Sequence, residues 1–116
     1  MSDLEKLLEI EGSRVAFEFA PDGRLVRYAA QPGIARQEAE RMARLAAGIS
    51  HMFELLADSL EGAGSSPWRP QNGWLYCGGH WTLMVDNGRR GVVVRADQVD
   101  LNRTQEALFA LRGPSE

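Results

Sequence analysis

The sequence predicts an α/β (α+β) domain in which a five-stranded antiparallel sheet lies between helices, as a three-layer α/β/α sandwich. Three observations predict it: stretches of alternating apolar residues, short turn signals between them, and one long apolar stripe at helical spacing. The elements follow in the order α-β-β-α-β-β-β-α along 116 residues. Because this length is typical of one domain with its own core, we expect residues 1–116 to form a single domain.

The N-terminal part predicts a short helix followed by a β-hairpin. Leucines recur at helical spacing within residues 2–10. Residues 13–20 alternate between apolar and polar side chains, as a half-buried strand does. A Pro-Asp-Gly turn at residues 21–23 then leads into a second strand at residues 24–30.

A long helix is predicted at about residues 35–60. Its apolar residues form one stripe with a period of 3.6, and we expect that stripe to face the core. The stripe consists of Met42, Leu45, Ile49, Met52, Phe53, Leu56 and Leu60. A loop rich in Gly, Ser and Pro follows at residues 61–73.

The C-terminal part predicts three strands and a last helix. The strands are expected at residues 73–77, 80–86 and 89–95. Gly78-Gly79 and Asn87-Gly88 separate them, and both pairs are typical of two-residue hairpin turns. Residues 98–111 have the apolar spacing of a helix.

The two turns determine the predicted register of the last three strands. The first turn sets Cys77 opposite His80, and the second sets Leu83 opposite Val92. One face then carries Trp74, Tyr76, Trp81, Leu83, Val85, Val92 and Val94. The other carries Leu75, Cys77, Thr82, Met84 and Val93. Since both faces are largely apolar, we expect the long helix to cover one and the short helices the other.

This order of elements resembles the Roadblock (dynein light-chain 7) superfamily, and is most similar to its small bacterial members. The resemblance extends from Leu4 to Leu111. The same pattern is more distantly similar to the profilin-like sensor folds. It is carried by Leu4–Leu8, Val15–Phe19, Pro21-Asp22-Gly23, the helix from Ala39 to Leu60, the Trp81–Val94 hairpin and Leu101–Leu111. The tryptophans at Trp68, Trp74 and Trp81 depart from the superfamily's general pattern.

The resemblance implies a dimer formed through the edge strand after the long helix, with the two long helices side by side. Members of the superfamily serve as scaffolds or regulators, often of Ras-like small GTPases. We therefore expect a cytoplasmic, non-enzymatic homodimer that acts as a scaffold or regulatory subunit and binds a protein such as a small GTPase.

The residues themselves also favour a helix contact. Ala39, Ala43, Ser50 and Ala57 form a row of small side chains, which would let a second helix approach closely. Alanine is also the best helix former, so the row has a simpler explanation. The strand at residues 73–77 is apolar and would aggregate as an open edge, which favours pairing with its own copy. The predicted interface therefore comprises Ala39, Ala43, Ser50, Ala57, Trp74, Leu75 and Tyr76.

A second binding region is predicted in the loop at residues 61–73. Two prolines hold Trp68 and Arg69 in an extended segment, and both residue types are enriched at binding hot spots. Alternatively, Trp68 folds back over Trp74 or the sheet edge and seals the core. We expect Trp68, Arg69 and Trp81 to contact a partner or ligand.

The alternative function is a small-molecule-binding sensor, or an accessory protein of a metabolic pathway. Its pocket would be lined by aromatic side chains. These are Trp68, Trp74, Tyr76 and Trp81.

Catalytic and metal sites receive little support. Cys77 and His80 could form a nucleophilic pair, but no third group is positioned to orient the histidine. A metal site with His51 would need a fourth ligand. The glycine-rich segment at residues 62–66 follows a helix, whereas a phosphate loop precedes one. We predict no catalytic residue, no metal and no cofactor.

Composition excludes several other classes of protein. A single cysteine allows no intrachain disulfide and favours a reducing compartment. The net charge is −3 and the basic residues are scattered, which argues against nucleic-acid binding. Apolar runs are too short to span a bilayer, so we expect no membrane segment.

Overall fold

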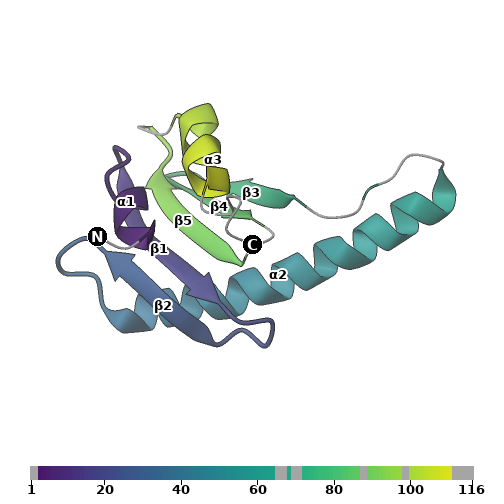
Figure 1. Cartoon of the computed structure of the whole chain (residues 1–116), viewed down its shortest axis with the longest axis horizontal. Coiled ribbons are helices and arrows are strands. Elements are labelled where there is room, and N and C mark those ends of the chain that lie inside the picture. Colours follow the sequence, from purple (N-terminus) through teal and green to yellow (C-terminus); the bar gives the residue numbers. More distant parts are fainter. Residues whose placement is uncertain (1–2, 65–67, 69–71, 87–88, 98–99, 111–116) are drawn as a thin grey trace.

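A computed structural model of the chain describes residues 3–64, 68, 72–86, 89–97 and 100–110 (Figure 1). Its elements are α1 (Asp3–Leu7), β1 (Ser13–Phe19), β2 (Leu25–Ala30), α2 (Arg36–Ala63), β3 (Gly73–Cys77), β4 (Trp81–Asp86), β5 (Arg90–Arg95) and α3 (Leu101–Ala110). The strands form one antiparallel sheet in the order β2-β1-β5-β4-β3. The predicted element order and sheet are therefore confirmed, and β2 and β3 are the two edge strands.

Helices cover both faces of the sheet, as predicted (Figure 1). On one face α2 packs on β1, β2 and the middle of the sheet, around the fully buried Val15 and Phe17. On the other face α1 and α3 enclose a second apolar cluster, in which Leu4, Leu7 and Leu108 contact β4 and β5. The chain is thus a three-layer domain with a separate core on each side of its sheet.

The side of α2 that contacts the sheet is a row of alanines. Ala39, Ala43 and Ala46 are each 0% exposed and pack in the same cluster as Phe17 and Phe19. Because the sheet contributes large aromatic side chains to this layer, the helix backbone comes close only where its own side chains are small.

The large apolar stripe of α2 lies about a quarter turn around the helix from the alanines. Met42 and Ile49 are half-buried at the margin of the sheet. Leu45, Met52 and Leu56 are exposed. The prediction that this stripe faces the core was therefore wrong for most of its length.

The turn between β3 and β4 lies one residue later than predicted. Cys77 pairs with Thr82, not with His80, and the Gly78 N–H donates to the Trp81 carbonyl at 2.9 Å. Gly79 and His80 therefore form the turn in place of Gly78-Gly79. Moving the turn by one residue changes each strand pair by two residues, as from His80 to Thr82 opposite Cys77. Because side chains alternate with a period of two, each one keeps its predicted face.

The turn between β4 and β5 also differs from the prediction, and it changes which face of the sheet each side chain of β5 lies on. Leu83 pairs with Val93 instead of Val92, so Val93 lies on the α2 side, while Val92 and Val94 lie on the other. Arg89 has a φ of 63°, the left-handed conformation typical of the last residue in a three-residue loop. One extra turn residue reverses every side chain of the following strand. Asn87 and Gly88 themselves lie outside the described residues.

The second half of α2 extends past the sheet (Figure 1). The helix has 28 residues, which corresponds to a length of about 42 Å at 1.5 Å per residue. Its first half lies under β1 and β2, whereas its second half continues beyond β3. We call residues 50–63 the arm.

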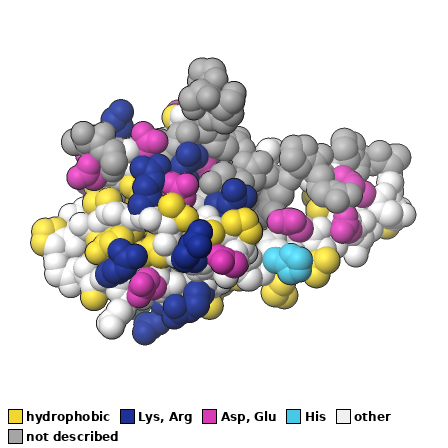
Figure 2. All heavy atoms as spheres, turned by 60° about the horizontal axis from the view of Figure 1, so that its bottom comes forward, with side chains coloured by type: hydrophobic (Ala, Val, Ile, Leu, Met, Phe, Trp, Pro, Cys, Tyr) yellow, Lys and Arg dark blue, Asp and Glu magenta, His cyan; other side chains and the backbone are white. Residues whose placement is uncertain are grey.

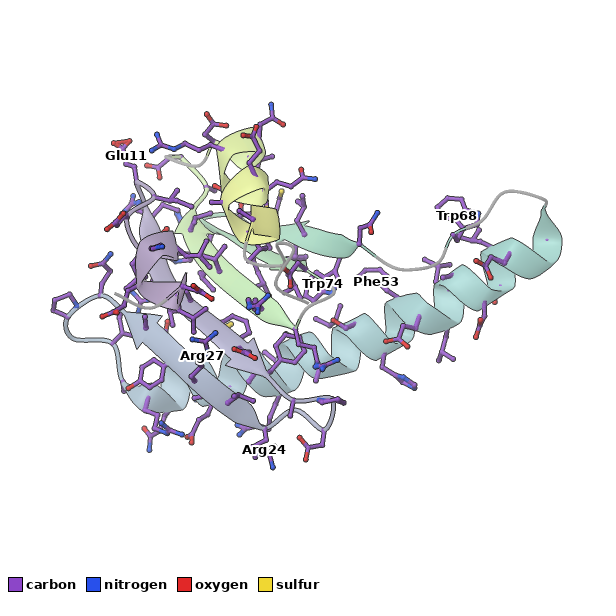
Figure 3. The ribbon with its side chains drawn as sticks, viewed as in Figure 1. Glu11, Arg24, Arg27, Phe53, Trp68 and Trp74 are labelled. Carbon is purple, nitrogen blue, oxygen red and sulfur yellow. The ribbon has the colours of Figure 1, made fainter. Side chains whose placement is uncertain are left out.

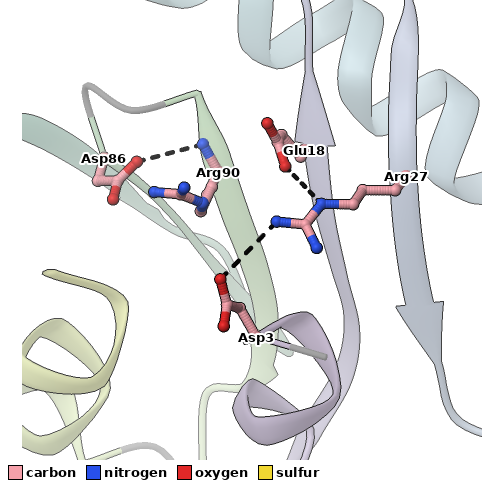
Figure 4. A network of polar contacts seen from close by, with 5 residues as sticks. All are labelled: Asp3, Glu18, Arg27, Asp86 and Arg90. Carbon is pink, nitrogen blue, oxygen red and sulfur yellow. Dashed lines mark hydrogen bonds and ion pairs between the residues drawn. The ribbon is translucent and has the colours of Figure 1, made fainter. Parts of the chain in front are cut away.

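Ion pairs tie α1, β1 and β2 together at the opposite end of the molecule (Figure 4). The Arg27 guanidinium donates from Nε to Glu18 at 2.6 Å, and one of its terminal nitrogens lies 3.9 Å from an Asp3 carboxylate oxygen. In the first turn of α2, Glu38 accepts two hydrogen bonds from Arg14 on β1, at 2.6 and 3.0 Å. The charged side chains named here therefore have their ion-pair partners within the chain.

Candidate interaction surface

The edge strand β3 exposes large apolar side chains. Leu75 is 45% exposed and Tyr76 is 66% exposed, one on each face of the strand. Among the described strands, β3 pairs with β4 alone, so its other side is an open edge of backbone N–H and C=O groups. This edge can accept a further strand.

A second uncovered apolar surface lies on α2 beside that edge. It begins at Leu45 and continues along the arm, and its most exposed member is Met52 at 67%. The exposed side chains of this surface, which we call the α2 flank, are Leu45, Met52, Phe53, Leu55 and Leu56. Soluble monomers rarely expose so many neighbouring large apolar side chains.

An apolar groove of about 470 Å³ separates the α2 flank from the β3–β4 hairpin. It is lined by Met42, Leu45, Ile49, Tyr76, Gly78, Gly79, His80, Trp81, Leu83 and Val93. Nearly all of its surface is apolar, which suits hydrocarbon or aromatic groups and offers few polar partners.

Trp74 links β3 to α2. Its indole Nε1–H donates to the Ser50 hydroxyl at 2.8 Å, and its ring lies 5.7 Å from that of Phe53. Figure 3 shows Trp74 and Phe53 facing one another between the strand and the helix. Trp74 therefore holds the start of β3 against the beginning of the arm.

Trp81 lies between two arginines at the other end of the hairpin. The Arg14 guanidinium is 5.3 Å from its ring centre and that of Arg95 is 5.9 Å away. Glu38 accepts hydrogen bonds from Arg14, which raises the pKa of Arg14 and lowers the pKa of Glu38. Both arginines thus contact the Trp81 ring, which lines the groove.

The predicted loop residues are only partly placed. The Trp68 backbone N–H donates to the Glu61 carboxylate at 3.0 Å, and its side chain remains 53% exposed. Trp68 lies beside the end of the arm, well away from Trp74 (Figure 3). It therefore does not seal the core against Trp74. Arg69 lies outside the described residues.

The four aromatics predicted to line one pocket do not come together. Tyr76 and Trp81 line the groove, whereas Trp74 packs on α2 and Trp68 lies at the arm. The sequence did not indicate this division, because the alternation along β3 and β4 gives the same inward face to Trp74 and Trp81.

The predicted row of small residues on α2 is not an open flank. Ala39 and Ala43 are fully buried against their own sheet, and Ala57 is nearly buried. Ser50 accepts the hydrogen bond from Trp74. Ala39 and Ala43 therefore cannot contact a second helix, contrary to the interface predicted for them, because the sheet already occupies their side of α2.

The structure also does not place Cys77 opposite His80, as the predicted register did. Cys77 is exposed opposite Thr82, and the His80 carbonyl accepts a hydrogen bond from the Ala96 N–H. Among the described residues, no three His, Cys, Asp or Glu side chains are grouped so as to hold a metal ion.

A family model described as "Uncharacterized conserved protein (DUF2173)" matches residues 3–110. The chain belongs to this DUF2173 family. Among curated proteins, none matches the sequence.

Solved structures with the Roadblock fold are similar to the chain along most of its length. A Roadblock/LC7 domain from Streptomyces avermitilis superposes with a TM-score of 0.76 at 15% identity, over 94% of this chain and 88% of that one. The gliding protein MglB from Thermus thermophilus gives 0.64 at 23% identity, over 91% and 82%. An MglB with a tetrameric arrangement gives 0.69 at 20% identity, again over 91% and 82%. The DUF2173 chain therefore has the Roadblock fold.

In the described part of the chain, no helix combines the length and the apolar character that crossing a membrane requires. Even α2, the longest of these helices, carries charged side chains in both of its halves.

Proposed function

We propose that this protein is a non-enzymatic homodimeric scaffold or regulatory protein, in which β3 pairs with β3 of a second copy. The observation that carries the proposal is the open edge of β3, where Leu75 and Tyr76 are exposed beside the equally exposed α2 flank. Two apolar surfaces that adjoin on one side of a small domain are typical of a subunit interface. Similarity to an MglB with a tetrameric arrangement supports self-association.

In this proposal Leu75 and Tyr76 keep the interface role predicted for them, and Trp74 positions the strand. The helix contact moves from the alanine row to the α2 flank. Trp68 at the end of the arm, together with Arg69, remains available to a protein partner of the dimer.

The oligomeric state tests the proposal directly. Light scattering after size exclusion at micromolar concentration should give twice the mass of one chain. Leu75→Lys should yield monomers, because a buried lysine without a partner is costly at a seam. Val26→Lys is the matched control, since Val26 is equally exposed on the other edge strand, β2. A wild-type monomer, or a Leu75→Lys variant that dimerises as tightly as Val26→Lys, would contradict it.

We further propose a Ras-like small GTPase as the partner, on the basis of the Roadblock resemblance. The test uses small GTPases from the same genome, loaded with GDP or with a non-hydrolysable GTP analogue. Binding of the wild-type dimer, and a change in GTP hydrolysis rate, are the expected results. Failure of every such GTPase to bind would remove this partner class and leave the scaffold role.

The apolar groove favours the second candidate, a small-molecule-binding sensor. Its volume lies within the range of ligand pockets, and Trp81 at its wall would report binding through its fluorescence. A metabolite screen should then quench that fluorescence in wild type but not in Trp81→Phe. If no compound changes the fluorescence or the thermal midpoint, the sensor role is excluded.

A further inference from the structure

A second cleft, distinct from the apolar groove, lies between the β1–β2 turn and the first half of α2. Its volume is about 310 Å³, at the lower end of the range for ligand pockets, and its surface is polar as well as apolar. We call it the hairpin cleft. It is lined by Asp22, Gly23, Arg24, Leu25, Glu40 and Arg44. Among the described residues, the cleft and the groove have no lining residue in common, so they are separate sites.

The β1–β2 turn is held against α2 at the hairpin cleft. Gly23 has a φ of 92°, which favours glycine, and its N–H donates to the Ala20 carbonyl at 2.8 Å. The Asp22 Oδ1 atom accepts the Arg24 N–H at 3.0 Å, which closes the turn a second time. A Cβ on Gly23 would lie 3.4 Å from the Arg44 Cα, so the turn rests directly on the helix. The backbone segments that carry Arg24 and Arg44 are therefore fixed relative to one another.

Arg24 and Arg44 are the cationic groups of the hairpin cleft, and both are exposed. Arg24 directly precedes β2 (Figure 3), whereas Arg44 lies about two turns into α2. Within the described ranges, neither guanidinium forms an ion pair, although four other arginines each pair with a carboxylate: Arg14, Arg27, Arg36 and Arg95. Because a planar guanidinium matches a carboxylate in two parallel hydrogen bonds, this pair of arginines suits a carboxylate from outside the chain.

Asp22 and Glu40 give the same cleft two negative charges. In the described part of the chain, Asp22 uses its Oδ1 atom alone, in the turn, so its Oδ2 atom can accept from a ligand. The Glu40 Oε2 atom accepts from the Arg36 Nε at 3.3 Å in an exposed pair, which contributes little and can exchange. Figure 2 shows basic and acidic side chains interspersed over the part of the molecule that contains the sheet.

The lining of the hairpin cleft is thus neutral in sum, with two arginines against one aspartate and one glutamate. A site that carries both signs of charge is matched best by a ligand that also carries both. Leu25, which is 8% exposed, adds one apolar side chain to the lining. These properties favour a small zwitterion over a simple anion or cation.

We propose that the hairpin cleft binds a free α-amino acid. The carboxylate of the amino acid lies between the guanidinium groups of Arg24 and Arg44, and its ammonium group donates to the carboxylates of Asp22 and Glu40. Charge-assisted hydrogen bonds at both ends orient the ligand. The cleft lies within one chain and apart from the apolar groove, so this inference depends on neither function proposed above.

Titration of the ¹⁵N-labelled protein with each of the standard amino acids tests the proposal. At least one should shift the Nε–Hε signals of Arg24 and Arg44 in the NMR spectrum, with a dissociation constant below about 10 mM. Its N-acetyl derivative lacks the ammonium charge, and its amide lacks the carboxylate charge. Each of these two probes should bind at least about tenfold more weakly than the amino acid itself.

Substitutions in the hairpin cleft test the same contacts from the side of the protein. Arg24→Gln and Arg44→Gln should each weaken binding by about tenfold or more. Asp22→Asn keeps an oxygen for the turn but loses the charge, so it should weaken binding of the amino acid and leave the weak binding of the N-acetyl derivative unchanged. Arg41→Gln is the matched control, because Arg41 is an exposed arginine one turn before Arg44 that does not line the cleft. It should change binding by less than about twofold.

Three results would overturn the proposal. The first is that no standard amino acid binds at about 10 mM. The second is an N-acetyl derivative that binds as tightly as its parent, since the site would then recognise a simple carboxylate. The third is an equal loss in Arg41→Gln and Arg44→Gln, which would indicate general electrostatic attraction. The oligomeric state bears on the homodimer alone, so the two proposals fail separately.

Discussion

The two halves of α2 differ in what they contact, although they belong to one uninterrupted helix. In residues 36–49 the alanines are buried against β1, and Glu38 is paired with Arg14. In the arm, Met52, Leu55 and Leu56 are all at least half exposed. The first half is thus stabilised by its own sheet, whereas the second exposes the apolar surface that an assembly would bury. The difference shows that apolar content in this chain exceeds the needs of one core.

The largest expected contrast between these regions comes from truncating one large side chain in each. Phe17→Ala should lower the free energy of unfolding by about 3–5 kcal/mol at any protein concentration, because Phe17 is fully buried. Leu56→Ala should lower it by less than about 0.5 kcal/mol in the monomeric Leu75→Lys background. Urea unfolding at two protein concentrations measures both.

If the proposed dimer forms, the wild-type background should give the complementary result for these substitutions. There Leu56→Ala should weaken association, which lowers the urea midpoint and makes it less dependent on protein concentration. A large, concentration-independent loss from Leu56→Ala in the monomer would show that the arm belongs to the core, and the comparison would fail.

A smaller effect is expected at the junction of the two halves. Trp74→Phe removes the hydrogen bond to Ser50 and keeps the ring contact with Phe53. The free energy of unfolding should fall by about 1 kcal/mol. Ser50→Ala removes the same bond from the other side, so the double variant should cost no more than about the larger single one. Additive costs would argue that the bond does not link strand and helix.

The smallest effect concerns the ion pair in the first half. Arg14 donates to the Glu38 carboxylate and lowers the pKa of that carboxyl below its ordinary value. Since the folded pKa is lowered, the stabilisation is fully present above the unfolded pKa of about 4.3 and is lost as the pH falls through the lowered folded pKa. The pair is partly exposed, so its contribution should be below about 1 kcal/mol.

The gap in unfolding free energy between wild type and Glu38→Gln measures this contribution. It should be constant near neutral pH and close progressively in acid. Glu40→Gln is the matched control, because Glu40 pairs with Arg36 on the exposed surface and should cost only a few tenths of a kcal/mol. A gap that stays constant down to acid pH would show that the ion pair does not stabilise the fold.

Local patterns were sufficient to predict the elements of the fold. Val15, Phe17 and Phe19 alternate because one side of β1 faces the core, and that alternation is visible in the sequence. The turn at Gly23, with a φ of 92°, was likewise recognisable from Pro21-Asp22-Gly23. These features depend on neighbours in the chain, which is why sequence reasoning located them.

The candidate site was predicted only in part. The apolar edge at Leu75 and Tyr76 followed from composition and strand order, and it lies at the sheet margin in the structure. The α2 flank was missed, since all of its residues except Leu55 were assigned to the core. No local signal could have separated the two, because both sides of α2 are apolar and only the packing shows which side the sheet occupies.

The sequence by itself determined the order of the elements, the two-sided sheet and the excess of apolar residues. Periodicity shows that a helix has apolar sides, but it does not show which of two such sides packs against the sheet. Only the tertiary structure decided that the alanines of α2 face the sheet, because Phe17 and Phe19 leave room for small side chains alone. It likewise decided the faces of β5, because the conformation of Arg89 lengthens the turn by one residue. Both decisions arise from contacts or backbone geometry that the local pattern does not encode.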